Sequence, residues 1–348
     1  MGSRKSVTIN GIKIGGGAQV RVESMLKTPL SNLDGCRADA EALKAEGCEL
    51  ARVSLPDLAL AGNLAALVKS TSLTLMADIH FNHKLALAAI EAGCRAIRIN
   101  PGNMSGAEGI REIVSAAKAS DVVIRIGANG GSLNNNQIEA AQGDRASALA
   151  AAVEEQLRIL TDAGFSNLIL SAKSSSVPET IKANFMLAQK YPFPFHIGIT
   201  EAGGGLSGVV KGAVGIGGML LQGIGDTIRV SLTAPGTEEV KVGYDILKAL
   251  EIRRKGYNFI SCPTCGRRRI DVAALSERVK ALLPKDLKDG ITIAVMGCEV
   301  NGPREAAGAD LGIAGTPDGF VLFRKGHPLF SGPLEMLPDE FKKALDTL

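Results

Sequence analysis

The chain has 348 residues, of which 45% are hydrophobic and 22% charged, a composition typical of a globular protein with a large core. Its formal net charge of +3 lies far from the basic excess of nucleic-acid-binding proteins, so we expect no nucleic-acid partner. No run of eighteen apolar residues is present, and the first residues lack the apolar core of a secretory signal. We therefore expect no membrane association and a cytoplasmic location.

Short apolar runs rich in β-branched residues alternate with helical segments along the first 256 residues, a pattern that predicts parallel strands with helices outside. The expected strands are Gln19 to Ser24, Leu50 to Ser54, Leu73 to Ile79, Ala96 to Asn100, Val122 to Gly127, Asn167 to Ala172, Phe195 to Thr200 and Thr227 to Leu232. Helices are expected between them, for example over Asp34 to Glu46, Asn82 to Ala92, Arg145 to Ala163 and Gly236 to Arg253. Eight such units predict a TIM (β/α)8 barrel over residues 1–256, followed by a small domain over 257–348.

Polar residues stand where each apolar run stops, which is where TIM barrels place their chemistry. They are Glu23, Ser24, Arg52, Ser54, Asp78, His80, Arg98, Asn100, Arg125, Asn129, Ser171, Lys173, His196, Thr200, Glu201, Arg229 and Ser231. Members of a pair two residues apart, such as Arg98 and Asn100, point to one face of a strand. Any single arginine at such a place is commonly solvated or ion-paired, but five cations at equivalent places predict a pocket for a phosphate or diphosphate ester.

Glycine-rich segments follow two of the strands, at Gly127 to Ser132 and Ala202 to Gly208. Free backbone N–H groups at such places favour anions. Neither segment fits the dinucleotide-binding pattern, so we expect no nucleotide cofactor of that kind.

Six cysteines in a chain of this length indicate a reducing compartment. Cys36, Cys48 and Cys94 fall in apolar helical segments and are expected to be inert core thiols. Cys262 and Cys265 form a CxxC, and Cys298 follows in a separate loop. Three thiolates without a second CxxC favour an iron-sulfur cluster, with a zinc site as the alternative.

Six motifs resemble, in order, those of the bacterial 4-hydroxy-3-methylbut-2-enyl diphosphate synthase family. They are Asp78-Ile-His-Phe81, Arg98-Ile-Asn-Pro-Gly-Asn103, His196-Ile-Gly-Ile-Thr-Glu-Ala-Gly203, Gly223-Ile-Gly-Asp-Thr-Ile-Arg-Val-Ser231, Cys262-Pro-Thr-Cys-Gly-Arg267 and Cys298-Glu-Val-Asn-Gly-Pro303. The resemblance covers nearly the whole chain. It departs from the usual pattern at Glu23, where glutamine is common, and at Glu299 and Arg304, where small or apolar residues are common.

This resemblance implies a reductive dehydration that opens 2-C-methyl-D-erythritol 2,4-cyclodiphosphate to 4-hydroxy-3-methylbut-2-enyl diphosphate. It implies a 4Fe-4S cluster that relays single electrons and acts as a Lewis acid. The electron donor would be flavodoxin or ferredoxin. The family's dimer is arranged head to tail, so we expect a homodimer in which one subunit's cluster serves the other subunit's barrel.

The resemblance also implies roles for individual residues. Arg52, Arg98, Arg125 and Lys173 match phosphate-binding positions, and Asp78, His80, Asn100, Asn129 and His196 match other pocket residues. Glu201 matches a proposed proton donor. Cys262, Cys265 and Cys298 match the thiolate ligands of the cluster, and Glu305 matches the fourth ligand.

Two functions of other classes stay open from the sequence. One is a zinc-stabilised barrel hydrolase or transferase acting on a phosphate ester. The other is a non-catalytic sensor of a phosphorylated metabolite whose cluster responds to oxidants.

Overall fold

A computed structural model describes residues 3–101, 104, 106–284, 287–299 and 302–348. The chain divides into two compact units, Met1–Arg253 and Arg254–Leu348. The division lies close to the boundary after Gly256 that the sequence predicts. Among the described residues, no helix has both the length and the apolar content that a membrane span requires.

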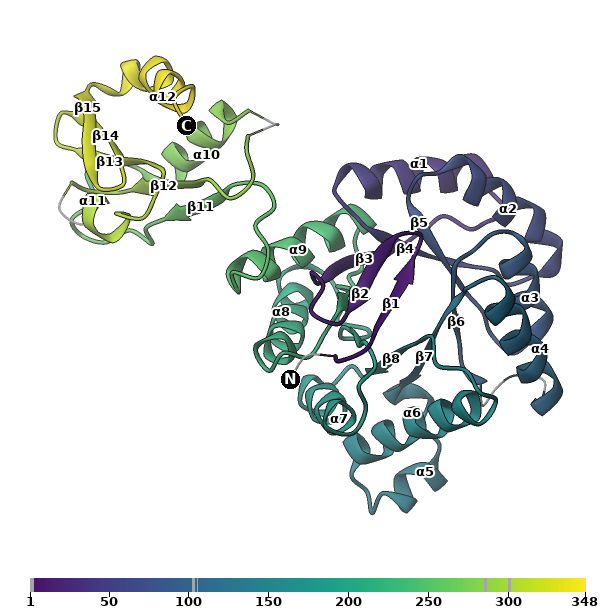
Figure 1. Ribbon diagram of the computed structural model, residues 1–348. Helices are drawn as coiled ribbons and strands as arrows, with labels where there is room; N and C mark the ends of the chain where they lie inside the picture. Colours follow the sequence, from purple (N-terminus) through teal and green to yellow (C-terminus); the bar gives the residue numbers. More distant parts are fainter. Residues whose placement is uncertain (1–2, 102–103, 105, 285–286, 300–301) are drawn as a thin grey trace. The chain divides into compact units, whose positions relative to one another are not determined.

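The first unit is a parallel β-barrel surrounded by helices (Figure 1). Its strands are β3 (Arg21–Met25), β4 (Leu50–Ser54), β5 (Thr74–Asp78), β6 (Ala96–Ile99), β7 (Val123–Asn129), β8 (Leu168–Lys173), β9 (His196–Ile197) and β10 (Thr227–Ile228). They hydrogen-bond in the order β8-β7-β6-β5-β4-β3-β10-β9. A parallel bridge between Leu170 and Phe195 joins the two ends of this order. The expected (β/α)8 barrel is confirmed.

The helices outside the barrel are α1 (Leu33–Ala45), α2 (Ala61–Ser70), α3 (His83–Glu91), α4 (Gly106–Ala119), α5 (Asn135–Ala140), α6 (Arg145–Asp162), α7 (Val177–Lys190), α8 (Gly205–Leu221) and α9 (Gly236–Ala249). Several begin at a residue whose side chain accepts a backbone N–H, as Asn82 does for α3 and Ser176 for α7. Such caps satisfy N–H groups that have no partner within the helix. Helix α9 ends before Arg253, the expected end, and Glu251 there has a left-handed φ of 56°.

The last two barrel strands are shorter than the sequence predicts. The ladder of β9 stops at Ile197, before Gly198, where the backbone of Arg229 comes so close that a Cβ would collide with its carbonyl oxygen. One further hydrogen bond, from Arg229 N to Ile197 O at 3.1 Å, follows the ladder of β10. After these two short strands the chain leaves the barrel, close to the polar side chains that line the cavity described below.

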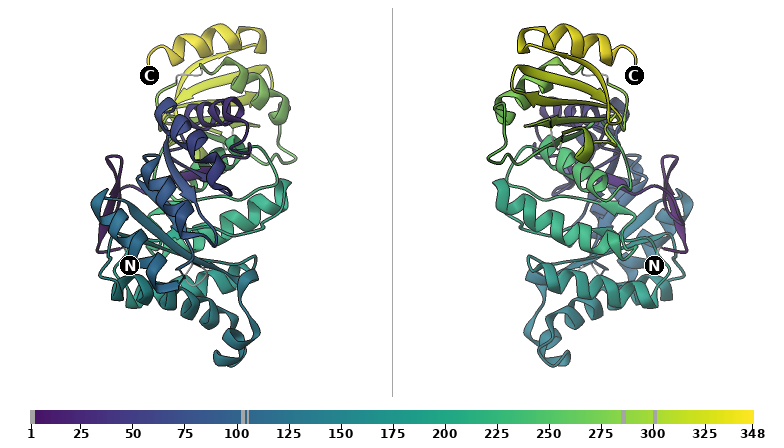
Figure 2. Two further views of the ribbon diagram at one scale, coloured as in Figure 1. Left: turned by 90° about the vertical axis from the view of Figure 1, so that its right-hand side faces the viewer. Right: turned by 90° about the vertical axis from the view of Figure 1, so that its left-hand side faces the viewer.

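A β-hairpin that the sequence analysis did not predict precedes the barrel. Strands β1 (Ser6–Ile9) and β2 (Ile12–Gly15) pair antiparallel, and Figure 2 shows them in purple near the N-terminus label. Asn10 and Gly11 connect them with φ values of 47° and 81°. Such values are typical of the tight turn that favours an Asn-Gly pair. Ile9 and Ile14 of the hairpin are fully buried against inward-facing barrel residues such as Met76 and Val123, so the hairpin fills one end of the barrel interior.

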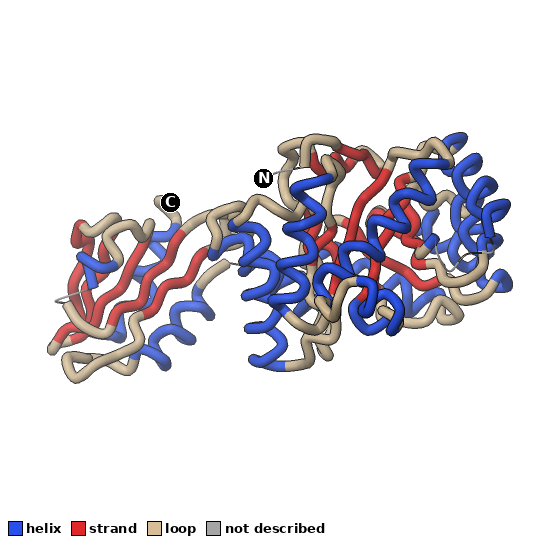
Figure 3. The backbone as a smooth tube through the Cα atoms, turned by 90° about the horizontal axis from the view of Figure 1, so that it is seen from below, coloured by secondary structure: helices blue, strands red, loops and turns tan. Residues whose placement is uncertain are grey.

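The second unit is a mixed sheet with helices beside it, shown in red and blue in Figure 3. Its elements are β11 (Asn258–Ser261), α10 (Val272–Leu282), β12 (Thr292–Met296), α11 (Gly302–Glu305), β13 (Leu311–Thr316), β14 (Gly319–Arg324), β15 (His327–Gly332) and α12 (Leu337–Leu345). Strands β11, β12 and β13 are parallel, and β14 and β15 continue the sheet antiparallel. Its core contains Val279, Ile293, Phe320 and Phe341, each fully buried.

We predict that Ile14→Ala lowers the free energy of unfolding by about 2–5 kcal/mol, because it leaves a cavity among the residues that fill the barrel end. Urea unfolding followed by circular dichroism measures this change. Lys13→Ala, at an exposed neighbouring position, is the control and should change the stability by no more than about 0.5 kcal/mol. Equal stability of the two variants would show that the hairpin does not support the barrel.

Candidate active site

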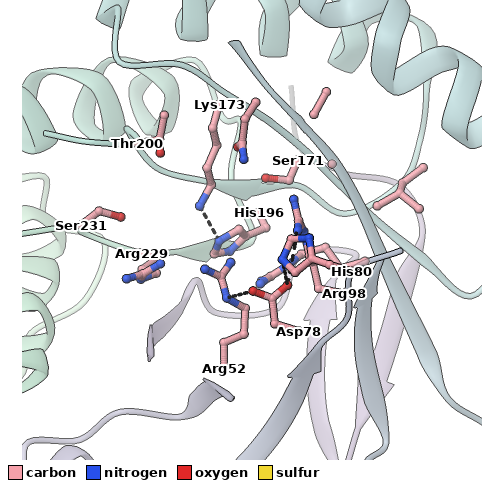
Figure 4. A pocket seen from close by; sticks show the side chains of 15 residues that line it. Arg52, Asp78, His80, Arg98, Ser171, Lys173, His196, Thr200, Arg229 and Ser231 are labelled. Atoms are coloured by element: carbon pink, nitrogen blue, oxygen red, sulfur yellow. Dashed lines mark hydrogen bonds and ion pairs between the residues drawn. The ribbon is translucent and has the colours of Figure 1, made fainter. Parts of the chain in front are cut away.

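A cavity of about 160 Å³ lies among residues at the C-terminal ends of the barrel strands (Figure 4). It is lined by Arg52, Asp78, His80, Arg98, Arg125, Ile126, Gly127, Ala128, Asn129, Ser171, Lys173, His196, Thr200, Arg229 and Ser231. Of the substrate-binding residues predicted from the sequence, all except Asn100 belong to this lining. Their role in binding a ligand stays a prediction.

Asp78 and two arginines form one charged group of this lining, and the register of the parallel strands sets part of their positions. Asp78 on β5 is paired with Arg98 on β6, which is paired with Arg125 on β7. Asp78 lies 3.3 Å from Arg52 Nε and 3.4 Å from Arg98 Nη1. Burial alone would raise the pKa of Asp78, but a hydrogen bond with His80 and the charges of the two arginines hold it well below the ordinary value. Asp78 therefore stays ionised and anchors two arginines.

Glu23 and Arg125 form a buried ion pair that joins β3 to β7 across the barrel. Glu23 Oε2 accepts from Arg125 Nη1 at 2.6 Å, and both residues are only 1% exposed. Burial opposes ionisation of Glu23, yet the charge and hydrogen bond of Arg125, with help from Arg52 and Lys173, lower its pKa. Glu23 Oε1 and Arg125 Nη2 are buried and have no hydrogen-bond partner among the described residues. A ligand oxygen in the cavity could satisfy the arginine nitrogen.

Lys173, His196 and Thr227 form a buried chain of hydrogen bonds. Lys173 Nζ lies 2.8 Å from His196 Nε2, and His196 Nδ1 lies 2.8 Å from Thr227 Oγ1. Burial, followed by the charges of neighbouring arginines, lowers the pKa of both Lys173 and His196 well below their ordinary values. Binding of an anionic ligand would reverse part of this effect, because it brings negative charge next to Lys173.

Asn100 and Glu201 lie outside this lining, as do Glu23, Ser24 and Ser54 of the strand-end residues named from the sequence. Strand β6 ends at Ile99, so the alternation that should place Asn100 on the same face as Arg98 does not continue to it. Asn100 instead lines a neighbouring cavity of about 460 Å³ that shares Ala128 with the first. Glu201, the predicted proton donor, is exposed, follows Thr200 of the lining and has a left-handed φ of 51°. Strained backbone of this kind often marks functional loops.

Thr227 and Glu239 contact residues of the lining from outside the cavity, and neither was predicted from the sequence. Thr227 lies at the start of β10 and gave no signal of its own, because it looks like any β-branched strand residue. Glu239 Oε2 lies 3.6 Å from Arg229 Nε. Glu239 does not stand out in the sequence, because it follows Glu238 in the first turn of α9. Acidic residues are common in the first turn of any helix.

The second unit has a cavity of its own, of about 220 Å³, which is lined by all four predicted cluster ligands. Its lining is Cys262, Pro263, Thr264, Cys265, Arg267, Met296, Gly297, Cys298 and Glu305. Gly297 N donates to Cys262 Sγ at 3.1 Å. Hydrogen bonds to Cys265 from the backbone and side chain of Arg267 lower the pKa of that thiol. The hydrogen bonds to Cys262 and to Cys265 favour the thiolate form of each side chain, which is the form in which cysteine binds metal.

The four side chains line one cavity, and the kind of metal centre they could hold depends on the ligand spacing that each kind of centre needs. Among the residues that the structure describes, no three such side chains are placed to hold a single metal ion. A tetrahedral zinc ion needs its ligands within about 2.3 Å of one centre. An iron-sulfur cluster binds each thiolate through a different iron, so its ligands lie further apart.

Glu299, the other carboxylate near Cys298, points elsewhere. Its Oε1 lies 3.8 Å from Arg269 Nε, and Glu299 is not among the residues that line the cysteine cavity. The cysteine loops therefore bring Glu305, rather than Glu299, to the cavity.

Comparisons with known proteins cover both units. A sequence model of the GcpE TIM-barrel domain matches residues 4–244, and one of the GcpE protein C-terminal domain matches residues 258–347. A protein of Thermodesulfovibrio yellowstonii is 44% identical over 325 residues, which cover 93% of each chain. One of Geobacter sulfurreducens is 43% identical over 93% of this chain and 91% of its own. Both are named 4-hydroxy-3-methylbut-2-en-1-yl diphosphate synthase (flavodoxin).

A solved structure resembles the barrel unit in fold alone. The dihydropteroate synthase of Yersinia pestis superposes with a TM-score of 0.52 at 12% identity, covering 72% of this chain and 100% of its own.

We predict that Arg125→Ala lowers the free energy of unfolding by about 3–5 kcal/mol, because it leaves the Glu23 carboxylate buried without its partner. It should also weaken ligand binding in the cavity, while the cysteine site, which belongs to the second unit, stays intact. Urea unfolding measures the first effect. Arg111→Ala removes an exposed arginine of α4 and is the control. Stability equal to that of the control would mean that the ion pair contributes nothing.

The same pair predicts a pH dependence. Because the folded-state pKa of Glu23 is lowered from 4.5, its ionised form stabilises the fold fully above that value, and this contribution is lost as the pH falls through the folded-state pKa. The stability difference between the wild type and Glu23→Gln should therefore be constant near neutral pH and shrink in acid. A difference that stays the same down to about pH 3 would contradict this linkage.

Proposed function

The chain belongs to the GcpE family, and from this premise we propose that its barrel cavity binds 2-C-methyl-D-erythritol 2,4-cyclodiphosphate for reductive ring opening. The product is 4-hydroxy-3-methylbut-2-enyl diphosphate, the compound after which the curated relatives are named. The reaction takes up two electrons, opens the ring and releases one oxygen as water. The enzyme is an oxidoreductase of isoprenoid precursor biosynthesis.

The observation that carries this proposal is the set of cations in the cavity. Arg52, Arg98, Arg125, Lys173 and Arg229 come from five different strands or strand ends and line one space. Arginine binds phosphate oxygens through two parallel hydrogen bonds, and each charged hydrogen bond contributes about 1.5–3 kcal/mol. A ligand with two phosphates suits this arrangement better than a neutral ligand, because the basic side chains outnumber Glu23, Asp78 and Glu239, the carboxylates paired with them.

Other lining groups suit the sugar-like part of the substrate. Asn129, Ser171, Thr200 and Ser231 offer neutral donors and acceptors. Glu201 lies at the edge of this group and is proposed to supply the proton that the departing oxygen needs. His80 and His196 would complete the binding site.

The second unit would hold a 4Fe-4S cluster through Cys262, Cys265, Cys298 and Glu305. The fit rests on their shared cavity, on the N–H donor to Cys262 Sγ and on the lowered pKa of Cys265. When bound, the cluster supplies single electrons and a Lewis-acidic iron.

The proposal extends to the partners and the location of the protein. The printed names of the relatives include flavodoxin, so we assign flavodoxin as the electron donor, with ferredoxin as the alternative. A head-to-tail homodimer would bring one subunit's cluster to the other subunit's barrel. The use of Cys262, Cys265 and Cys298 as metal ligands rather than in disulfides would fit a reducing compartment, the cytoplasm.

Anaerobic turnover of the cyclic diphosphate with a strong reductant tests the function. The protein should form the open-chain diphosphate and contain iron and sulfide near four per chain. Zinc in place of iron would favour the hydrolase or transferase, and a full cluster without turnover would favour the sensor.

The ligand assignment is tested by a pair of variants. Glu305→Ala should leave a cluster that is assembled but labile and nearly inactive, whereas Glu299→Ala should keep most activity. Carboxylate is a harder, more readily displaced ligand than thiolate, so the iron it binds differs from the other three. Mössbauer spectra should show a changed unique iron only in Glu305→Ala. A change confined to Glu299→Ala would overturn the assignment.

A further inference from the structure

A third buried carboxylate, Glu239, lies behind the active-site lining, where it contacts Ser24, the residue that follows Glu23 on β3. Glu239 belongs to the first turn of α9, and its side chain has no exposed surface. Placing a carboxylate in the interior costs several kcal/mol unless charged or polar groups surround it. The groups that surround Glu239 therefore indicate what it does.

Both oxygens of Glu239 have partners. Oε1 accepts from Lys27 Nζ at 3.0 Å and from the backbone N–H of Leu232 at 3.1 Å. Oε2 accepts from Ser24 Oγ at 2.9 Å and lies 3.6 Å from Arg229 Nε. Lys27 Nζ also donates to Leu232 O at 3.0 Å and to Ala234 O. The carboxylate thus links the end of β3 to the segment that follows β10.

Two residues of the cavity lining depend on this link. Arg229 presents its Nε to Glu239, which orients the guanidinium so that its terminal nitrogens remain for a ligand in the cavity. Ser231 directly precedes Leu232, whose N–H is bound to Glu239. This hydrogen bond therefore also holds the backbone of Ser231, which lines the cavity.

Arg229 needs such an anchor because its neighbours repel it. Its positive charge acts on Arg52 and Lys173, lowering the pKa of each. Within the part of the chain that the structure describes, its Nε is buried without a hydrogen-bond partner, and the carboxylate of Glu239, 3.6 Å away, compensates its charge. Without that charge, we expect Arg229 to move away from the other cations.

We propose that Glu239 is a positioning residue that holds Arg229 and Ser231 in place for the diphosphate. This inference rests on the proposed function, since it takes the cavity to be the diphosphate site. A simple role in helix stability does not account for the burial, because the exposed neighbour Glu238 can interact with the N-terminus of α9 equally well.

Removal of the charge has two opposing effects on an anionic ligand. It raises the net positive charge of the cavity, which favours the anion, and it releases Arg229, which costs the anion a charged contact. We expect the second effect to win, because the guanidinium must be held against repulsion before it can bind in the right geometry.

Calorimetric titration of the holoenzyme with inorganic pyrophosphate tests the proposal. Glu239→Gln, which keeps the shape and removes the charge, should weaken binding about tenfold or more. In turnover, KM should rise by a similar factor while kcat stays within about threefold, as expected for a lost binding contact. The control Glu238→Gln should match the wild type. If Glu239→Gln does not fold, Glu239→Asp keeps the charge at shorter reach and should show a smaller loss of the same kind.

A double-mutant cycle shows whether Glu239 acts through Arg229. In an Arg229→Gln background, Glu239→Gln should cost less than about twofold in pyrophosphate affinity, because the residue it positions is gone. Unchanged or tighter binding by Glu239→Gln, or an equal loss in both backgrounds, would overturn the proposal and leave the function intact. A wild type that binds neither pyrophosphate nor the cyclic diphosphate would overturn the proposed function itself, and this inference with it.

Discussion

Repulsion among the cations of the barrel cavity is the constraint on which the rest of the site depends. Five basic side chains line one space of about 160 Å³, and two like charges about 4 Å apart repel by about 4 kcal/mol at an effective dielectric constant of 20. Three buried carboxylates, Glu23, Asp78 and Glu239, oppose this repulsion. Each lies against at least one arginine, so the cations keep defined positions before any ligand arrives.

The parallel barrel makes this arrangement possible. Its register sets Asp78, Arg98 and Arg125 side by side on consecutive strands, and its closure brings Glu23 on β3 opposite Arg125 on β7. Three carboxylates do not neutralise five basic groups. Part of the imbalance is relieved by Lys173, whose pKa is lowered by burial and by the nearby arginines. The remaining positive charge is what a diphosphate would neutralise.

Much of the lining could be predicted from the sequence, because a polar residue that ends an apolar run in a barrel must lie at its mouth. The alternation along the strand does not extend to Asn100, which follows the last residue of β6 and lines the neighbouring cavity, so its role in binding stays a prediction. The prediction failed for Glu239, since nothing in the sequence distinguishes a buried first-turn glutamate from its exposed neighbour. That difference arises only when α9 packs beside β3. The N-terminal hairpin was predictable from Asn10 and Gly11 and was overlooked.

A crystal structure of the anaerobically prepared holoenzyme with the cyclic diphosphate tests the central claim most directly. The account predicts that both phosphates lie in the barrel cavity against Arg52, Arg125 and Arg229. It also predicts that these guanidinium groups remain on their carboxylates, with positions little changed from those described above. Phosphates bound elsewhere, or arginines that leave Glu23, Asp78 and Glu239 to reach the ligand, would contradict the claim that the cavity is built in advance for a diphosphate.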